Sequence, residues 1–216
     1  MALSFDLVPL ERLAHDTLST YICSVLQRIN LTKLHTLASV SLGTLARPTT
    51  TGCVVLLQPN NLNDFQSFLF QPENFVDECL AVERATLQPG DVLLPAKGPQ
   101  LRPLLVTEAC EGVAASAGFF ILRCRPALHP AYLVAYLAHP WGQQQLRELL
   151  NPSTTVAALN KSALLGLEVP LLALPVQQRL GKLHQAWLRE QELTQALLAR
   201  KQEFYQQTFA HIVTVS

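Results

Sequence analysis

The sequence predicts an α+β protein in which a mixed-sheet domain is followed by a long C-terminal helix. Between residues 33 and 122, short runs rich in Val and Leu alternate with Pro, Gly and Asn clusters, which is typical of strands and loops. Residues 176–209 contain no proline and no glycine after Gly181, and their apolar side chains recur at helical spacing. Hydrophobic residues make up 49% of the 216 positions and charged residues 15%, so the chain can bury a core and is not disordered in bulk.

Charge and cysteine content exclude several classes of protein. Sixteen Lys and Arg balance sixteen Asp and Glu, which excludes a polybasic nucleic-acid coat. The first ten residues lack the basic region and cleavage site of a signal peptide. The apolar tract 156–176 is broken by Lys161, Glu168 and two prolines, so it is not a membrane span. Five scattered cysteines without CxxC spacing favour reduced thiols in a cytoplasmic protein.

The segment 1–32 is predicted to be dominated by an amphipathic helix over about residues 10–30. Its apolar face comprises Leu10, Leu13, Ala14, Leu18, Tyr21, Ile22, Val25, Leu26 and Ile29. Its other face carries Glu11, Arg12, Asp16 and Arg28. Two interpretations remain open: the helix packs on its own domain, or it joins a partner's helical bundle.

The middle of the chain predicts several further elements. Strands are expected at Cys53–Leu57, Asp91–Leu94, Leu104–Val106, Phe119–Leu122 and, as a short extended segment, Val169–Leu172. Pro130 opens a helical pattern that ends near His139, and a second short helix is expected over Trp141–Leu150. Asn151–Ala157 is expected to be a polar loop.

The C-terminal segment predicts one helix of roughly 30 residues, about 45 Å long. Its apolar stripe consists of Leu180, Leu183, Trp187, Leu193, Leu197, Phe204 and Thr208. A stripe of this length requires another surface of similar length, as in a coiled coil, although Glu190 and Lys201 interrupt a strict heptad. The helix is therefore either half of an extended helix pair or folded back on its own domain.

No motif indicates catalysis. Neither GxGxxG nor GxxxxGK[ST] is present, so no phosphate-binding loop can be assigned. The stretch Asn151–Thr154 is similar to the start of an adenine methyltransferase motif, but the second proline and the aromatic residue of that motif are missing. The six histidines show no local pairing with a nucleophile and no metal-ligand spacing. We therefore expect a protein that is not an enzyme and holds no metal.

Five segments form an ordered pattern along residues 33–209. They are Lys33–Ala38 with Ser41–Gly43, Gln88–Gly98, Pro130–Leu137 with Trp141–Gln143, Ser153–Thr155 with Leu159–Leu164, and Val169–Leu171 with Pro175–Leu180. No single segment is specific for one protein family, but the five segments in this order are specific together. Together they resemble the specificity subunit of type I restriction-modification systems.

The resemblance implies a target recognition domain over 33–174 and a spacer helix over 175–216, after the N-terminal helix 1–32. Family members usually carry two such units, so this chain is similar to half a subunit that pairs with a second copy or another specificity-type chain. The implied function is non-enzymatic recognition of double-stranded DNA in a type I-like complex, with or without a restriction subunit. This chain would hold no cofactor; the modification subunits would bind S-adenosylmethionine and methylate a flipped adenine.

Site residues follow from the matching loops. The candidate base readers are Arg47, Thr50, Lys97, Gln100, Arg102, Thr154, Thr155 and Lys161. Arg and Lys suit guanine, Gln suits adenine, and Thr suits a hydroxyl contact or a thymine methyl. Each could instead be an ordinary solvated loop residue. The candidate partner-binding residues are Leu183, Trp187, Leu197 and Phe204.

Two departures from the family pattern favour an alternative function. Residues 33–150 hold eight Lys and Arg against nine Asp and Glu, a net charge of −1, whereas a DNA reader normally presents a basic surface. Pro95 and Pro99 also stiffen the loop around Lys97. The alternative is a protein-interaction scaffold with the same fold in a defence complex.

Overall fold

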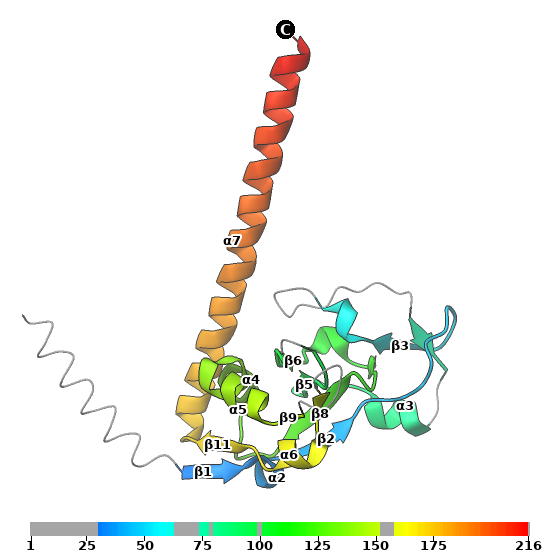
Figure 1. Cartoon of the computed structure of the whole chain (residues 1–216), viewed down its shortest axis with the longest axis vertical. Helices are drawn as coiled ribbons and strands as arrows, with labels where there is room; N and C mark the ends of the chain where they lie inside the picture. Colours follow the sequence, from blue (N-terminus) through cyan, green and yellow to red (C-terminus); the bar gives the residue numbers. More distant parts are fainter. Residues whose placement is uncertain (1–29, 63–73, 78–79, 99–100, 152–157, 216) are drawn as a thin grey trace, which may run out of the picture.

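The computed structural model describes residues 30–62, 74–77, 80–98, 101–151 and 158–215, which form a head domain and a long projecting helix (Figure 1). We call residues 30–173 the head and the helix α7 (Leu174–Val215) the stem. The helix predicted over about 10–30 lies outside the described residues except for Asn30, and that residue begins strand β1 instead.

A four-stranded antiparallel sheet forms the centre of the head, in the order β2 (Ala38–Leu42), β8 (Phe119–Cys124), β5 (Val92–Pro95) and β6 (Leu104–Leu105). Successive side chains of a strand point to opposite faces of a sheet. Val92, Leu94, Phe120 and Leu122 accordingly enter one apolar cluster, whereas Leu93, Phe119 and Ile121 enter another. The sheet is buried on both faces, which explains why β5 and β8 read as continuous apolar runs.

A smaller mixed sheet lies on one side of the head. Its order is β4 (Phe75–Val76), β3 (Val54–Leu57) and β7 (Ala114–Ala115), with β3 parallel to β7 and antiparallel to β4. Helix α3 (Leu80–Ala85) and the short 3-10 turns η1 (Pro59–Asn61) and η2 (Glu108–Cys110) accompany it.

Short helices cover the other side of the head. They are α2 (Leu34–Leu37), α4 (Pro130–Ala138), α5 (Pro140–Glu148) and α6 (Lys161–Leu165), and β9 (Leu150–Asn151) pairs with β10 (Ala158–Leu159) beside them. Pro130 and Pro140 each occupy the first helical turn, where the missing N–H costs no hydrogen bond. Helix α4 is largely buried and carries much of the core.

The two ends of the head meet in a small antiparallel sheet. Strand β1 (Asn30–Lys33) pairs with β11 (Glu168–Leu171), so that Asn30 lies opposite Leu171. The hydroxyl of Tyr132 donates to Pro170 O at 2.7 Å and that of Tyr136 to Glu168 O at 3.2 Å, which fixes β11 to α4. The chain therefore enters the head beside the point where it leaves for the stem.

The stem is longer than the sequence predicted, with 42 residues. At 1.5 Å per residue it spans about 63 Å. The predicted helix ended at Phe209, just after Thr208, the last residue of its apolar stripe. The helix continues through His211 and Ile212, because no proline or glycine interrupts it there. Its first turns pack on α4, and the rest projects away from the head (Figure 1). The first turns thus pack on the chain's own domain, and the pairing of the projecting part with another helix stays a prediction.

One face of the stem anchors it to the head. The Gln177 side chain is 0% exposed and makes three hydrogen bonds: Oε1 accepts from His129 N at 2.7 Å, and Nε2 donates to Ala127 O at 3.0 Å and Leu172 O at 2.7 Å. One turn later, Gly181 lets the two helices approach closely, because a Cβ there would lie 2.8 Å from the Ala131 Cβ. The anchoring face is distinct from the exposed apolar stripe.

An ion pair between the buried Asp91 and the partly exposed Arg123 holds the turn before β5. Gly90 has a φ of 91°, which favours glycine, and the Asp91 carboxylate accepts from Gln88 N at 3.0 Å. Arg123 Nε on β8 donates to the same carboxylate at 3.0 Å, and its Nη2 donates to Thr86 O at 2.8 Å. The turn predicted from Gly90–Asp91 is therefore tied to the neighbouring strand.

The α+β class and the long C-terminal helix are confirmed. The predicted strands reappear as β3, β5, β6, β8 and β11, and the predicted short helices as α4 and α5. The expected loop 151–157 lies outside the described residues except for Asn151, which belongs to β9. Within the described part of the chain, no helix combines the length and apolar character that crossing a membrane requires.

Replacing Gln177 with leucine should lower the free energy of unfolding by about 3 kcal/mol, because it leaves the part-buried His129 N–H and two carbonyls without their partner. Urea denaturation followed by circular dichroism measures the change. Gln178→Leu is the matched control, since Gln178 is exposed on the same turn. Equal stability of the two variants would contradict the anchoring role.

Candidate functional site

Two of the predicted reader residues lie on loops that the structure joins. Lys97 follows β5, and its backbone forms an antiparallel bridge with Ala158. Beside it, Leu159 N donates to Ala96 O at 2.9 Å. Lys161 follows this segment by two residues, so both lysines extend from adjacent strands of backbone, and both side chains are exposed.

Local hydrogen bonds and backbone conformation fix the backbone position of each lysine. Gly98 has a φ of 116°, a left-handed conformation that ends the β5 extension just after Lys97. The Asn160 side chain accepts from Ser162 N at 2.9 Å and so caps α6, which makes Lys161 the first helical residue. The lysine side chains thus project from a backbone held by hydrogen bonds.

Arg102 lies on a supported segment that follows the Lys97 loop in the sequence. It is exposed, but the preceding Leu101 is buried, and Leu101 O accepts from Gln143 Nε2 of α5 at 2.9 Å. The same Nε2 donates to Leu137 O at 2.6 Å. The segment that carries Arg102 is therefore fixed to the helical side of the head.

The other predicted readers are not brought to this place. Arg47 and Thr50 are exposed on the connection between β2 and β3, which pairs with β4 through mutual backbone hydrogen bonds between Thr49 and Phe75. Arg47 and Thr50 therefore lie beside the smaller sheet. The remaining three, Gln100, Thr154 and Thr155, lie outside the described residues.

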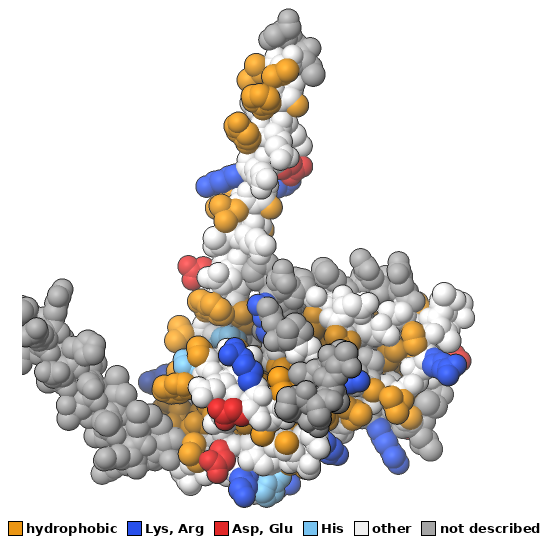
Figure 2. All heavy atoms as spheres, in the orientation of Figure 1, with side chains coloured by type: hydrophobic (Ala, Val, Ile, Leu, Met, Phe, Trp, Pro, Cys, Tyr) orange, Lys and Arg blue, Asp and Glu red, His pale blue; other side chains and the backbone are white. Residues whose placement is uncertain are grey.

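Basic side chains do not form one band on the face shown in Figure 2. Lys and Arg are scattered over the head there, separated by apolar and uncharged side chains. Arg123 is engaged with Asp91, so it supports the fold. In the described part of the chain, no group of three His, Cys, Asp or Glu side chains is placed to hold a metal ion.

The stem presents the predicted partner-binding residues to solvent. Leu183 is 67% exposed, Trp187 52%, Leu197 54% and Phe204 71%. Further apolar side chains are exposed on several sides of the same helix: Leu193, Leu198, Tyr205, Phe209, Ile212 and Val213. Soluble proteins rarely leave an apolar surface of this extent open, so it indicates a contact surface.

An apolar groove, which we call the basal groove, lies where the stem meets the head. It has a volume of about 550 Å³ and is lined by Tyr132, Ala135, Tyr136, His139, Trp141, Pro170, Leu172, Leu180, Leu183, His184 and Trp187. Burial, and to a smaller extent the neighbouring Tyr136, raises the pKa of Tyr132 to about 12, so its hydroxyl stays protonated at neutral pH. Sequence reasoning found the stem half of this groove but missed the half from α4, α5 and β11.

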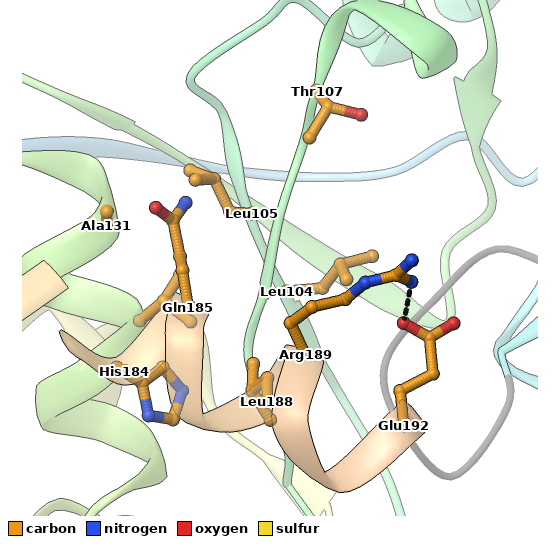
Figure 3. Close-up of a pocket in the computed structure, with 10 residues that line it drawn as sticks. Leu104, Leu105, Thr107, Ala131, His184, Gln185, Leu188, Arg189 and Glu192 are labelled. Atoms are coloured by element: carbon orange, nitrogen blue, oxygen red, sulfur yellow. Dashed lines mark hydrogen bonds and ion pairs between the residues drawn. The ribbon is translucent and has the colours of Figure 1, made fainter. Parts of the chain in front are cut away.

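A smaller pocket of about 200 Å³ lies between α4, β6 and the stem (Figure 3). Figure 3 shows Arg189 and Glu192 turned toward each other, with Arg189 Nη1 2.6 Å from Glu192 Oε2. His184 lines both this pocket and the basal groove. Burial lowers the pKa of His184, and its Nε2 has no hydrogen-bond partner among the described residues.

Comparison with known proteins identifies the fold. No protein-family model matches the sequence, and no curated protein matches it. Two solved structures align with 80% of this chain at 19% identity. One, from work on complex assembly and conformational transition of the type I R-M system, has a TM-score of 0.57 with 40% of that chain covered. The other, the HsdS subunit from Thermoanaerobacter tengcongensis, has a TM-score of 0.56 with 39% covered.

The likeness to these neighbours is one of fold, and it covers most of this chain. This chain spans about two-fifths of the length of each neighbour. The resemblance found in the sequence is thereby confirmed at the level of architecture: the chain has the fold of a type I restriction-modification specificity subunit.

Proposed function

We propose that this chain is a non-enzymatic, cytoplasmic DNA-recognition subunit of a type I-like restriction-modification or DNA methyltransferase complex. The observation that carries the proposal is the continuity of a specificity-subunit fold with an exposed 42-residue stem. The fold of the head by itself does not indicate which class of ligand it binds. A head fixed at one end of a helix with an open apolar stripe is suited to assembly with other helices.

The stem would bind the modification subunits and a second specificity-type chain. Its exposed stripe supports this, because Leu197 and Phe204 lie two helical turns apart on one face, well beyond the head. Covering this stripe removes apolar surface from water at about 25 cal/mol per Å². In such a complex, the partner's S-adenosylmethionine would supply the methyl group, and this chain would recognise the target sequence.

The head would read DNA through its loops. The support is the pair of adjacent loops that carry Lys97 and Lys161, with Arg102 on a neighbouring supported segment. A loop held by hydrogen bonds loses less conformational entropy when it binds. Arg47 and Thr50 would contact DNA only if it also reaches the smaller sheet, and Gln100, Thr154 and Thr155 remain sequence-based candidates.

A second candidate function is a protein-interaction scaffold in a defence complex. The net charge of zero and the scattered basic side chains in Figure 2 favour it. In that case the head would bind protein, and substitutions in the lysine-bearing loops would leave DNA binding and methylation unchanged.

Charges introduced into the distal stem should prevent self-association. The double variant Leu197→Glu, Phe204→Glu should sediment as a monomer under conditions where the parent chain forms dimers, because two carboxylates would be buried without partners. Gln195→Glu, Gln206→Glu adds the same charge on the opposite side of the helix and should leave the dimer intact. A parent chain that is monomeric throughout would remove the argument for helix pairing.

The chain alone should bind DNA weakly and with a shallow salt dependence, since a neutral protein displaces few counterions from DNA. Adding adenine methyltransferase subunits should tighten binding and steepen the slope of log K against log salt. Fluorescence anisotropy with a labelled duplex measures both quantities. Tight binding by the chain alone, with a slope equivalent to many phosphate contacts, would show that its neutral net charge does not limit contact with DNA.

Arg102→Ala should weaken binding by the assembled complex by about 1–3 kcal/mol and relax preference at one base position, if the guanidinium reads a base. Lys97→Ala and Lys161→Ala test the adjacent loops in the same way. Methylation of a randomised duplex library, followed by sequencing, distinguishes lost specificity from a uniform loss caused by phosphate contacts. Arg84→Ala is the control, since Arg84 is an exposed cation on α3 and is not among the candidate readers. If none of the head variants changes affinity or specificity, the scaffold function is favoured.

A further inference from the structure

We propose that the basal groove is the binding site of residues 10–29 of the same chain, which form an amphipathic helix that packs antiparallel against the first half of the stem. The proposal does not depend on DNA recognition. It rests on where the chain enters the head, on the composition of the groove, and on the sequence of the segment.

The entry point of the chain lies at the edge of the groove. Asn30 pairs with Leu171 and Leu31 with Pro170, and Pro170 and Leu172 line the groove. Strand β11 runs from there through Ala173 into the stem, whereas the chain before Asn30 arrives at the same end of the small sheet. A helix that ended at residue 29 and lay along the stem would therefore run antiparallel to it.

The segment is long enough to cover the groove. Twenty helical residues span about 30 Å at 1.5 Å per residue. The stem covers the same length between about residues 176 and 196, which is the part that carries Leu180, Leu183 and Trp187. Equal rise in the two helices brings Leu18 to about the level of Leu183 and Trp187. The distal stripe from Leu197 onward remains available for another chain.

The chemistry of the two surfaces is complementary. The sequence pattern places apolar side chains of residues 10–29 on one face, at the spacing that fills a groove between helices. The groove contributes the rings of Tyr132, Tyr136, Trp141 and Trp187. Its His184 Nε2 has no partner among the described residues, and Tyr21 supplies a hydroxyl within the apolar face of the segment. Occupation by this segment would cover Leu180 and Leu183 without a second chain.

The groove contains its own spectroscopic probe. The chain has two tryptophans, and both line the groove, where Trp141 is 61% and Trp187 52% exposed. If residues 10–29 occupy the groove, the full chain should emit at a shorter wavelength than a chain whose groove is open to water. Emission from the full chain should also be independent of protein concentration, because the contact is within one chain.

The test uses two double variants of the full chain. Leu18→Glu, Val25→Glu places two charges on the apolar face and should shift tryptophan emission to longer wavelength and increase quenching by iodide. Thr20→Glu, Gln27→Glu places the same charges on the opposite side of the segment and should leave both unchanged. Far-UV circular dichroism and urea denaturation confirm that the head remains folded in both.

A peptide of residues 8–29 provides the second measurement. Added to the Leu18→Glu, Val25→Glu chain, it should restore the emission of the parent, and the peptide with the same two glutamates should not. Identical emission and quenching of the two double variants would overturn the proposal. A shift that appears only as protein concentration rises would also overturn it, because a second copy would then fill the groove. None of these outcomes bears on DNA binding, which is measured separately.

Discussion

The arrangement of the whole molecule depends on the junction between α4, β11 and the first turns of the stem. Gln177 has no contact with water there, and its amide replaces that hydration with three backbone hydrogen bonds. Gly181 brings the stem against Ala131, and Tyr132 ties α4 to the strand that leads into the stem. A buried amide with its oxygen and both N–H groups engaged accepts few alternative geometries, so the stem leaves the head in a defined direction.

The two faces of the stem divide its roles. Gln177, Gly181, His184 and Leu188 recur at intervals of three and four and lie toward the head, whereas Leu180, Leu183 and Trp187 lie on a neighbouring face that the head leaves exposed. A helix that used a single apolar stripe for both purposes would have no surface left for other helices. Separating the faces lets the head fold independently of whatever covers the stripe.

Periodicity predicted the elements whose environment is uniform along their length. Helices α4 and α7 show 3.6-residue spacing, and β5 and β8 read as apolar runs because both faces of their sheet are buried. Strand β1 was missed because only its pairing with β11, far away in the sequence, makes it a strand. Gln177 reads as a surface residue of a polar helix, and only the backbone of residues 127–129 makes it an anchor. The adjacency of Lys97 and Lys161 depends likewise on one long-range bridge.

Because the junction is fixed, the length of the stem sets how a partner bound to its distal part lies relative to the head. Each residue of an α-helix advances its axis by 1.5 Å and turns it by about 100°. The number of residues between Gln177 and Phe204 therefore sets both the distance from the head to a partner on the distal stripe and the direction in which the head's loops face. A partner that binds Phe204 needs no contact with Lys97 or Lys161 to orient them. If the junction were mobile, pairing of the distal stripes would hold two heads together without fixing the relative orientation of their loops. A DNA duplex bound by both heads would then have to fix that orientation.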